Sequence, residues 1–261
     1  MSKISEQKGI IMTTDLYTKA ANAILNSKYT TGFTGAGISV ESGIPPFRGK
    51  DGLWNKYDPS VLDLDRFYAN PEAAWKLIKD IFYDFFGAAK PNDAHKVLGN
   101  LEKEGLLKEV ITQNIDNLHQ EGGSTVVHEF HGNSQRLVCT KCAKSYKPDS
   151  ELLETLPPYC ECGGLLKPDF IFFGEMIPQD ALQAAYHAAE NAEVFIVIGS
   201  TGEVYPASQI PVLAKENGAT IIEINTGESL FTSSITDILL KGKATEVMDK
   251  LYSVIQQQKQ N

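Results

Sequence analysis

Short apolar runs alternate with segments of helical periodicity along most of this chain. Two runs, Val194–Gly199 and Thr220–Asn225, have the length and the β-branched content of strands that are buried on both faces of a parallel sheet. Two weaker runs cover 110–113 and 29–34, and Gly32 interrupts the second of them. These runs predict the strands of one parallel sheet.

Helical patterns lie between the apolar runs. Asp15 is an expected N-cap for a helix with one apolar face, and either Asn92 or Asp93 is expected to cap another. Two more helical patterns cover 180–192 and 206–217. Alternating strands and helices favour the α/β class, here a doubly wound, Rossmann-like parallel sheet.

Two segments interrupt this alternation. Residues 41–90 form an aromatic-rich helical pattern after a loop of Gly and Pro, and residues 133–168 contain every cysteine. We expect both to be insertions that together form a smaller helical and zinc-binding domain. The Rossmann-like domain is then built from residues 1–40, 91–132 and 169–261.

Composition restricts the class of partner. The 261 residues contain 24 Lys+Arg against 33 Asp+Glu, a net charge of −9, which disfavours direct binding to nucleic acid. No apolar run reaches the roughly 18 residues that cross a bilayer, and the N-terminal MSKISEQKGIIMTTD has no apolar core of a signal peptide. We therefore expect a cytoplasmic protein without a membrane partner.

The four cysteines form a Cys-x-x-Cys pair, Cys139 and Cys142, and a Cys-x-Cys pair, Cys160 and Cys162. In a cytosolic protein this ligand type and spacing favour one structural zinc ion, since a site of four cysteines leaves no open position for water or substrate. Two disulfides or free thiols are the alternatives.

The segment GAGISVESGIPPFRG, residues 35–49, is the first candidate for binding chemistry. Its glycines allow the backbone to approach a pyrophosphate, but Val40 occupies the sixth place of G-x-G-x-x-G, so the glycines alone also fit a tight turn. Phe47 is placed to exclude water from a reacting centre, and Arg48 to meet a phosphate.

Two further motifs carry polar side chains. TQNIDNLH, residues 112–119, follows a predicted strand, and ligands of doubly wound sheets bind at the carboxyl ends of strands. His131 directly precedes the zinc segment, and an imidazole works as a base near neutral pH.

Taken in order, GAGISVESGIPPFRG, TQNIDNLH, FHGN, the cysteines and KPDFIFFGE resemble the sirtuins, which are NAD-dependent protein lysine deacylases. The resemblance runs from about residue 15 to residue 255. Within the family, the chain resembles prokaryotic members. It implies that the chain consumes NAD as a co-substrate and contains one structural zinc ion.

The resemblance places one group of residues around NAD: Gly35, Ala36, Gly37, Phe47, Arg48, Gln113, Asn114, Ile115, Asp116, Gly199, Ser200, Thr201, Asn225, Lys243 and Ala244. Within this group it implies that Arg48 lies at the pyrophosphate, Phe47 shields the ribose carbon under attack, and Asn114 holds the nicotinamide ribose. Asp116 is implied as the acceptor for the nicotinamide carboxamide, because a buried amide without a partner costs about 1–3 kcal/mol. Asn225 and Lys243 are implied at the adenosine.

The resemblance also implies the substrate residues: Ile171, Phe173, Gly174, Glu175 and Val204. The acyl-lysine of a protein or peptide is expected between the two domains, and its backbone is expected to pair with the enzyme as an added strand. The resemblance implies that the acyl oxygen attacks the ribose carbon and that nicotinamide leaves. The catalytic residues are implied to be His131 and Asn114, with His131 as the base for a ribose hydroxyl, and the products are free lysine and O-acyl-ADP-ribose.

Several alternatives stay open at this point. An ADP-ribosyltransferase would use the same site, and a zinc-ribbon binding module would contain only a degenerate nucleotide site. The side chain of Glu175 fits either a contact to a basic substrate or a solvated surface position. The chain also departs from the family pattern at its Cys-x-Cys and at Gly199–Gly202, where Gly-Thr-Ser-Leu is common.

The acyl preference is predicted from one position. Sirtuins that prefer succinyl- or malonyl-lysine contain a Tyr-x-x-Arg that binds the distal carboxylate, and here Tyr83 is present while Phe86 replaces the arginine. A carboxylate there would be buried without a cation, which costs several kcal/mol. We expect a deacetylase with weak desuccinylase activity.

Overall fold

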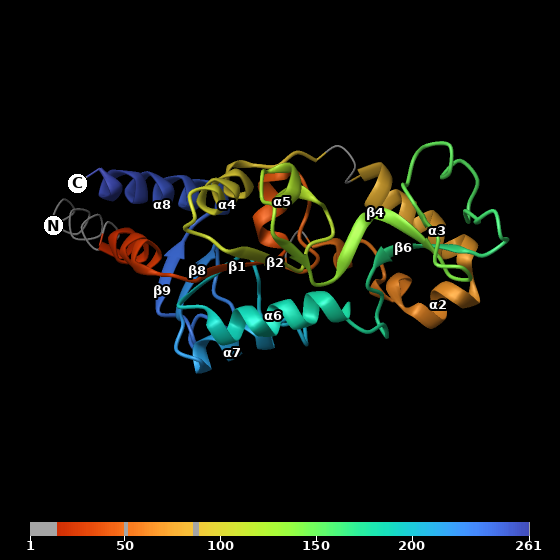
Figure 1. Ribbon diagram of the computed structural model, residues 1–261. Coiled ribbons are helices and arrows are strands. Elements are labelled where there is room, and N and C mark those ends of the chain that lie inside the picture. The colour runs from red at the N-terminus through yellow and green to blue at the C-terminus, as the bar shows by residue number, and fades with distance from the viewer. Residues whose placement is uncertain (1–14, 50–51, 86–88, 261) are drawn as a thin grey trace.

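A six-stranded sheet forms the centre of the larger part of the molecule in this computed structural model, which describes residues 15–49, 52–85 and 89–260 (Figure 1). Its strand order is β3-β2-β1-β7-β8-β9, and every neighbouring pair is parallel. The strands are β1 (Thr30–Thr34), β2 (Glu109–Thr112), β3 (Val127–Glu129), β7 (Val194–Ile198), β8 (Thr220–Asn225) and β9 (Ile238–Lys241). The order reverses between β1 and β7, and ligands of doubly wound sheets bind at such a switch point.

Helices cover both faces of this sheet (Figure 1). One layer contains the helical residues 15–26, α4 (Asp93–Lys103) and α8 (Ala244–Lys259), and the other contains α6 (Gln179–Asn191) and α7 (Gln209–Glu216). Within β7, Ile196 packs toward the first layer and Phe195 toward the second, because successive strand residues point to opposite faces. Two short helices, η1 (Ala36–Ser42) and α5 (Leu118–Glu121), lie near the carboxyl edge of the sheet.

The smaller part of the molecule combines a three-stranded antiparallel sheet with short helices (Figure 1). Its strands are β4 (Gly132–Cys139), β5 (Ser145–Tyr146) and β6 (Leu166–Phe170), and its helices are η2 (Leu53–Asn55), η3 (Pro59–Leu62), α2 (Leu64–Ala69), α3 (Pro71–Ile78) and η4 (Lys79–Phe85). Trp75 is fully buried in this second core, and its indole Nε1 donates to the carbonyl of Leu166 at 2.9 Å. This bond ties the helical segment to β6, although the two are far apart in the sequence.

The predicted α/β doubly wound class is confirmed, and the four predicted strands are present within one residue at each end. The sequence did not predict β3, β9 or the three-stranded sheet. Asn92 is the cap of α4, because its side-chain oxygen accepts from the Ala94 amide. The predicted cap at Asp15 is wrong, since Asp15 is itself helical and its carboxylate pairs with Lys19 at 2.9 Å. Helix α7 begins at Gln209, three residues later than position 206.

Candidate active site

A cavity of about 1030 Å³ lies at the carboxyl edge of the large sheet. Gly35, Gln113, Gly199 and Gly242 line it, and each directly follows a parallel strand. Residues 170–177, which are the last residue of β6 and the segment after it, line the cavity as well. The cavity therefore lies between the large sheet and the smaller part of the molecule, at the switch point where the doubly wound class predicts a ligand.

The two glycine segments at this edge touch one another. The amide of Gly37 donates to the carbonyl of Gly199 at 2.9 Å. A Cβ atom at Gly37 would lie 2.5 Å from the Cα atom of Gly199, and Gly199 has a φ of +63°. Both positions require glycine for this close contact, which leaves backbone rather than side chains at the cavity wall.

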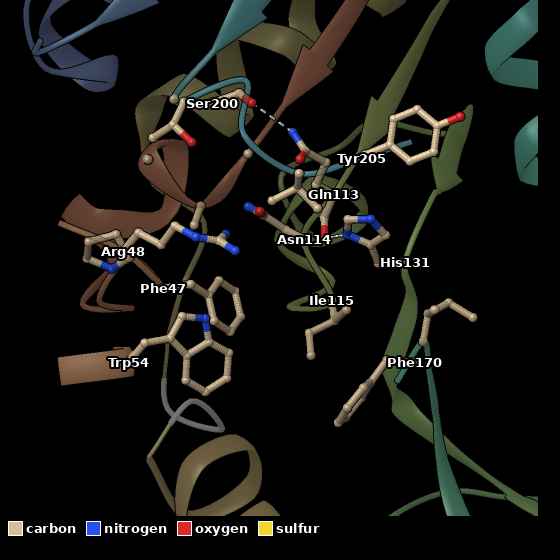
Figure 2. Close-up of a pocket in the computed structure, with 18 of the residues that line it drawn as sticks. Phe47, Arg48, Trp54, Gln113, Asn114, Ile115, His131, Phe170, Ser200 and Tyr205 are labelled. Carbon is tan, nitrogen blue, oxygen red and sulfur yellow. Dashed lines mark hydrogen bonds between the residues drawn. The ribbon is translucent and has the colours of Figure 1, made fainter. Parts of the chain in front are cut away.

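His131 projects into the cavity opposite Phe47 and Arg48 (Figure 2). Its Nδ1 lies 3.0 Å from the carbonyl oxygen of Gln113. A carbonyl only accepts hydrogen bonds, so this Nδ1 carries a proton, and in the neutral ring Nε2 then has a free lone pair. Burial lowers the pKa of His131, and the bond to Gln113 raises it in part. The geometry supplies a neutral imidazole that accepts a proton at Nε2.

A buried polar cluster supports the wall beside His131. Asn114 lines the cavity, and its Nδ2 donates to the hydroxyl of Ser39 at 3.1 Å. That hydroxyl donates to a carboxylate oxygen of Asp116 at 2.7 Å, and the amide of Leu118 donates to the other oxygen at 3.0 Å. Burial raises the pKa of Asp116, and these hydrogen bonds oppose the rise. Asp116 lies directly behind the lining, and it is the one predicted NAD residue that is not part of it.

The loop that follows η1 brings an aromatic pair and a cation to the cavity. Phe47 packs on Trp54 with ring centroids 5.3 Å apart, and both rings line the cavity (Figure 2). Arg48 lies 3.7 Å from a carboxylate oxygen of Glu203, and both side chains are about half exposed, at 44% and 49%. Such an exposed pair is weak, so the guanidinium is available to an anionic ligand.

Polar side chains link the strands at the opposite end of the cavity. The side-chain Nε2 of Gln113 donates to the hydroxyl of Ser200 at 3.0 Å (Figure 2), and Nδ2 of Asn225 donates to the Ser200 carbonyl at 3.0 Å. Lys243 lies 3.8 Å from Glu41, whose carboxylate also accepts from the amide of Thr245 at 3.0 Å. These contacts hold the ends of β2, β7 and β8 and the start of α8 around one space.

The segment after β6 supplies the apolar side of the cavity. Ile171, Phe173, Gly174 and Val204, the residues implied for the substrate, all belong to the lining, and Phe173 is 49% exposed. Glu175 also lines the cavity, but its carboxylate pairs with Lys167 at 3.0 Å. Its side chain is 22% exposed, so this carboxylate is a partly buried, paired group rather than a solvated surface group.

The structure also adds residues that the sequence did not single out as site residues. Ser39 joins Asn114 to Asp116, and its position two residues after Gly37 was the available signal. The other lining residues of this kind include Glu41, Phe170, Phe172, Met176 and Tyr205. Glu41, Phe170 and Phe172 lie within the recognised motifs, and Met176 and Tyr205 lie outside them. Only the folded chain shows which of these side chains turn inward.

The four cysteines converge in the smaller part of the molecule. Their Sγ atoms all lie within 4.8 Å of one another, and the closest pairs are 3.4–3.6 Å apart. A disulfide would bring two sulfurs to about 2.05 Å, whereas a tetrahedral zinc with Zn–S bonds of about 2.3 Å separates them by about 3.8 Å. The amides of Lys141 and Cys142 point at the sulfur of Cys139 at 3.4 and 3.5 Å, as thiolate ligands require. The donor set fits one structural zinc ion.

Comparison with known proteins agrees with this geometry. The model of the Sir2 family matches residues 35–206, which include the glycine segment, the 112–119 motif, His131 and all four cysteines. The chain belongs to the Sir2 family. A relative from Pyrococcus abyssi named NAD-dependent protein deacylase is 46% identical over 240 residues, which cover 89% of this chain and 95% of that protein.

Solved sirtuin structures share the whole architecture. A Sir2 homologue variant in complex with ADP-ribose superposes with a TM-score of 0.86 at 42% identity, covering 93% of this chain and 97% of the other. A Sir2 variant with deacetylated p53 peptide and 3'-O-acetyl ADP-ribose gives a TM-score of 0.85 at 38% identity, covering 90% and 96%. In the part of this sirtuin that the structure describes, no helix combines the length and the hydropathy needed to cross a bilayer.

Proposed function

We propose that this sirtuin is an NAD-dependent protein lysine deacylase that acts on acetylated lysine side chains of proteins or peptides. The observation that carries the proposal is His131, an imidazole that burial keeps neutral and whose Nε2 is left free inside a cavity of about 1030 Å³. Such a cavity lies at the upper end of ligand-site sizes, about 300–1,000 Å³, so it accommodates a dinucleotide together with a substrate side chain. The relatives named NAD-dependent protein deacylase support the same activity.

In this proposal, each residue of the cavity has a role that follows from its position. NAD supplies the ribose carbon that the acyl oxygen attacks with loss of nicotinamide. Phe47 covers this region and excludes water, while Arg48 meets the pyrophosphate. Asn114 holds the nicotinamide ribose, and His131 takes a proton from a ribose hydroxyl at Nε2. Residues 1–40, 91–132 and 169–261 would act as the NAD-binding domain, and 41–90 with 133–168 as the smaller domain.

The direct test is the product. Incubation of the protein with NAD and an acetyl-lysine peptide is expected to give free lysine peptide, nicotinamide and O-acetyl-ADP-ribose in equal amounts, measured by mass spectrometry. An ADP-ribosyltransferase would instead transfer label from the adenylate part of NAD to protein. Label on protein without O-acetyl-ADP-ribose would contradict the deacylase proposal.

The lining also supports a preference for neutral acyl groups. Phe86 lies outside the described residues. Tyr83 is not part of the described lining, since its ring stacks on Trp75 at 6.2 Å between centroids, and Phe82 lines the cavity instead. The apolar side of the described lining offers no cation to a succinyl carboxylate: Arg48 and Lys243 belong to the proposed NAD-binding groups.

We expect kcat/KM for an acetyl-lysine peptide to exceed that for the succinyl-lysine version of the same peptide by at least about 100-fold. The physical reason is the burial of an unpaired carboxylate, which costs several kcal/mol, while about 1.4 kcal/mol already gives a factor of ten. Steady-state kinetics on the two matched peptides at saturating NAD measure the ratio. A succinyl rate equal to the acetyl rate would show that a cation reaches the acyl group.

A further inference from the structure

A buried lysine lies immediately behind the apolar wall of the cavity. Lys167 on β6 is 9% exposed, and its Nζ donates to the carbonyls of Pro168 and Phe170 at 2.8 Å each. The third partner is the Glu175 carboxylate at 3.0 Å, and the same Nζ lies 4.2 Å from the ring centroid of Phe172. The three N–H donors of the ammonium group therefore have three acceptors, all within nine residues of sequence.

Glu175 closes a turn in the same segment. Its Oε2 accepts from the amide of Phe172 at 2.7 Å, while its own amide donates to the Phe172 carbonyl at 3.0 Å. Gly174 within this turn has a φ of +95°, which side-chain-bearing residues rarely adopt. One carboxylate oxygen thus bonds both Lys167 and the turn, so the ion pair fixes where residues 172–175 lie.

The clamped segment carries four of the five proposed substrate residues, all except Val204, and it contacts the base. The amide of Ile171 donates to the carbonyl of His131 at 2.8 Å. Two residues after Ile171, the amide of Phe173 donates to the carbonyl of Leu62 at 2.8 Å. The carbonyl of Phe173 accepts from the amide of Leu64 at 3.1 Å. A shift of the turn would therefore move the acyl-lysine wall against both His131 and the helical segment.

We propose that the Lys167–Glu175 pair, hereafter the clamp, positions the wall of the acyl-lysine site and so determines affinity for the acylated substrate, with Lys167 behind the lining of the cavity. The inference rests on the proposed deacylase function. Apolar side chains of similar size would fill the same space, but they would not orient the carbonyls of Pro168 and Phe170 or the turn at Gly174. Hydrogen bonds to a buried charge impose that geometry because they are strong and directional. The clamp lies on the peptide side of the cavity, so NAD is expected to bind independently of it.

Three variants test the clamp: Lys167→Met, Glu175→Gln and the double variant. In each, we expect Kd and KM for an acetyl-lysine peptide to rise about tenfold or more, because the peptide then meets a displaced wall. A misplacement of about 1 Å is enough to lower a reaction rate by up to about 100-fold. KM for NAD is expected to change less than about threefold. Peptide Kd is measured by fluorescence anisotropy without NAD, KM by steady-state kinetics and Tm by calorimetry.

The double variant separates positioning from stability. Lys167→Met leaves a partly buried carboxylate without its cation, so its Tm is expected to fall most. Neutralising Glu175 in the double variant is expected to restore part of that Tm. Peptide Kd is expected to stay raised in the double variant, because neither polar contact returns. Recovery of peptide Kd together with Tm would overturn the clamp and leave only a structural role.

Lys96→Met is the matched control, since Lys96 pairs with Asp93 at 2.9 Å on the exposed face of α4. It is expected to change neither Kd nor KM. If Lys167→Met does not fold, Glu175→Gln decides: a folded Glu175→Gln with unchanged peptide Kd and KM overturns the proposal. Absence of O-acetyl-ADP-ribose from the wild-type protein would contradict the deacylase function alone, because peptide Kd still reports on the clamp.

Discussion

Replacing His131 by alanine is expected to reduce deacetylation by about 10²–10⁴-fold, the range that general-base help contributes. NAD affinity should stay within about threefold, because the substitution leaves unchanged the groups proposed to bind NAD, namely the backbone of Gly37 and Gly199 and the loop at Arg48. Single-turnover rates and ADP-ribose binding by calorimetry measure the two quantities separately. Activity above a tenth of the wild-type value would exclude His131 as the base.

A matched control is His187→Ala. This imidazole is exposed on α6 and contacts Tyr29 with ring centroids 6.1 Å apart, outside the described lining of the cavity. Its removal is expected to leave kcat/KM unchanged. A large loss in this variant would show that substitution of a histidine elsewhere damages the enzyme without any effect on the base.

The pH dependence of the wild-type enzyme gives a second check on His131. Burial lowers the pKa of His131 below its usual value of about 6.5, so the base form persists below that pH. The rate kcat/KM is expected to fall only as the pH drops through this lowered pKa. An acidic limb centred above pH 6.5 would contradict the buried, neutral imidazole.

Loss of one cysteine is expected to have the largest effect on stability. Structural zinc contributes about 10–16 kcal/mol in zinc-finger peptides near pH 7, so Cys139→Ala should release zinc and lower Tm by at least about 10 °C. Zinc content by atomic emission and Tm by calorimetry should fall together. A folded, metal-free variant with normal activity would contradict the zinc assignment.

Cys162→Ala distinguishes ligation from packing. Cys139 is buried and Cys162 is exposed, so a packing role predicts a loss of stability for Cys139→Ala only. Ligation by all four sulfurs predicts equal loss of zinc in both variants, because their Sγ atoms lie 3.5 Å apart in one cluster. Normal zinc content in Cys162→Ala would exclude Cys162 as a zinc ligand.

The sequence by itself predicted the class of fold and indicated the residues that are proposed to carry the chemistry of the site. The β-branched runs at 194–199 and 220–225 predicted the central strands, because a strand buried on both faces has no polar side to alternate with. Short sequence motifs also indicated the glycine segment, His131 and the cysteine pairs, since phosphate binding, proton transfer and zinc ligation each require particular residue types close together along the chain.

Only the tertiary structure decided how these parts meet. Asp116 lies behind the cavity wall rather than in it, where its carboxylate accepts a hydrogen bond from Ser39 of another segment. The ring of Tyr83 stacks on Trp75 rather than lining the cavity. Glu175 is bound by Lys167, although sequence alone left it as a surface or substrate contact. Short strands such as β3 also depend on their neighbours, because a three-residue strand gains its stability from pairing rather than from its own pattern. The direction in which a side chain points and the partner of a buried charge both depend on contacts between distant segments. Periodicity and residue spacing along the sequence do not encode these contacts.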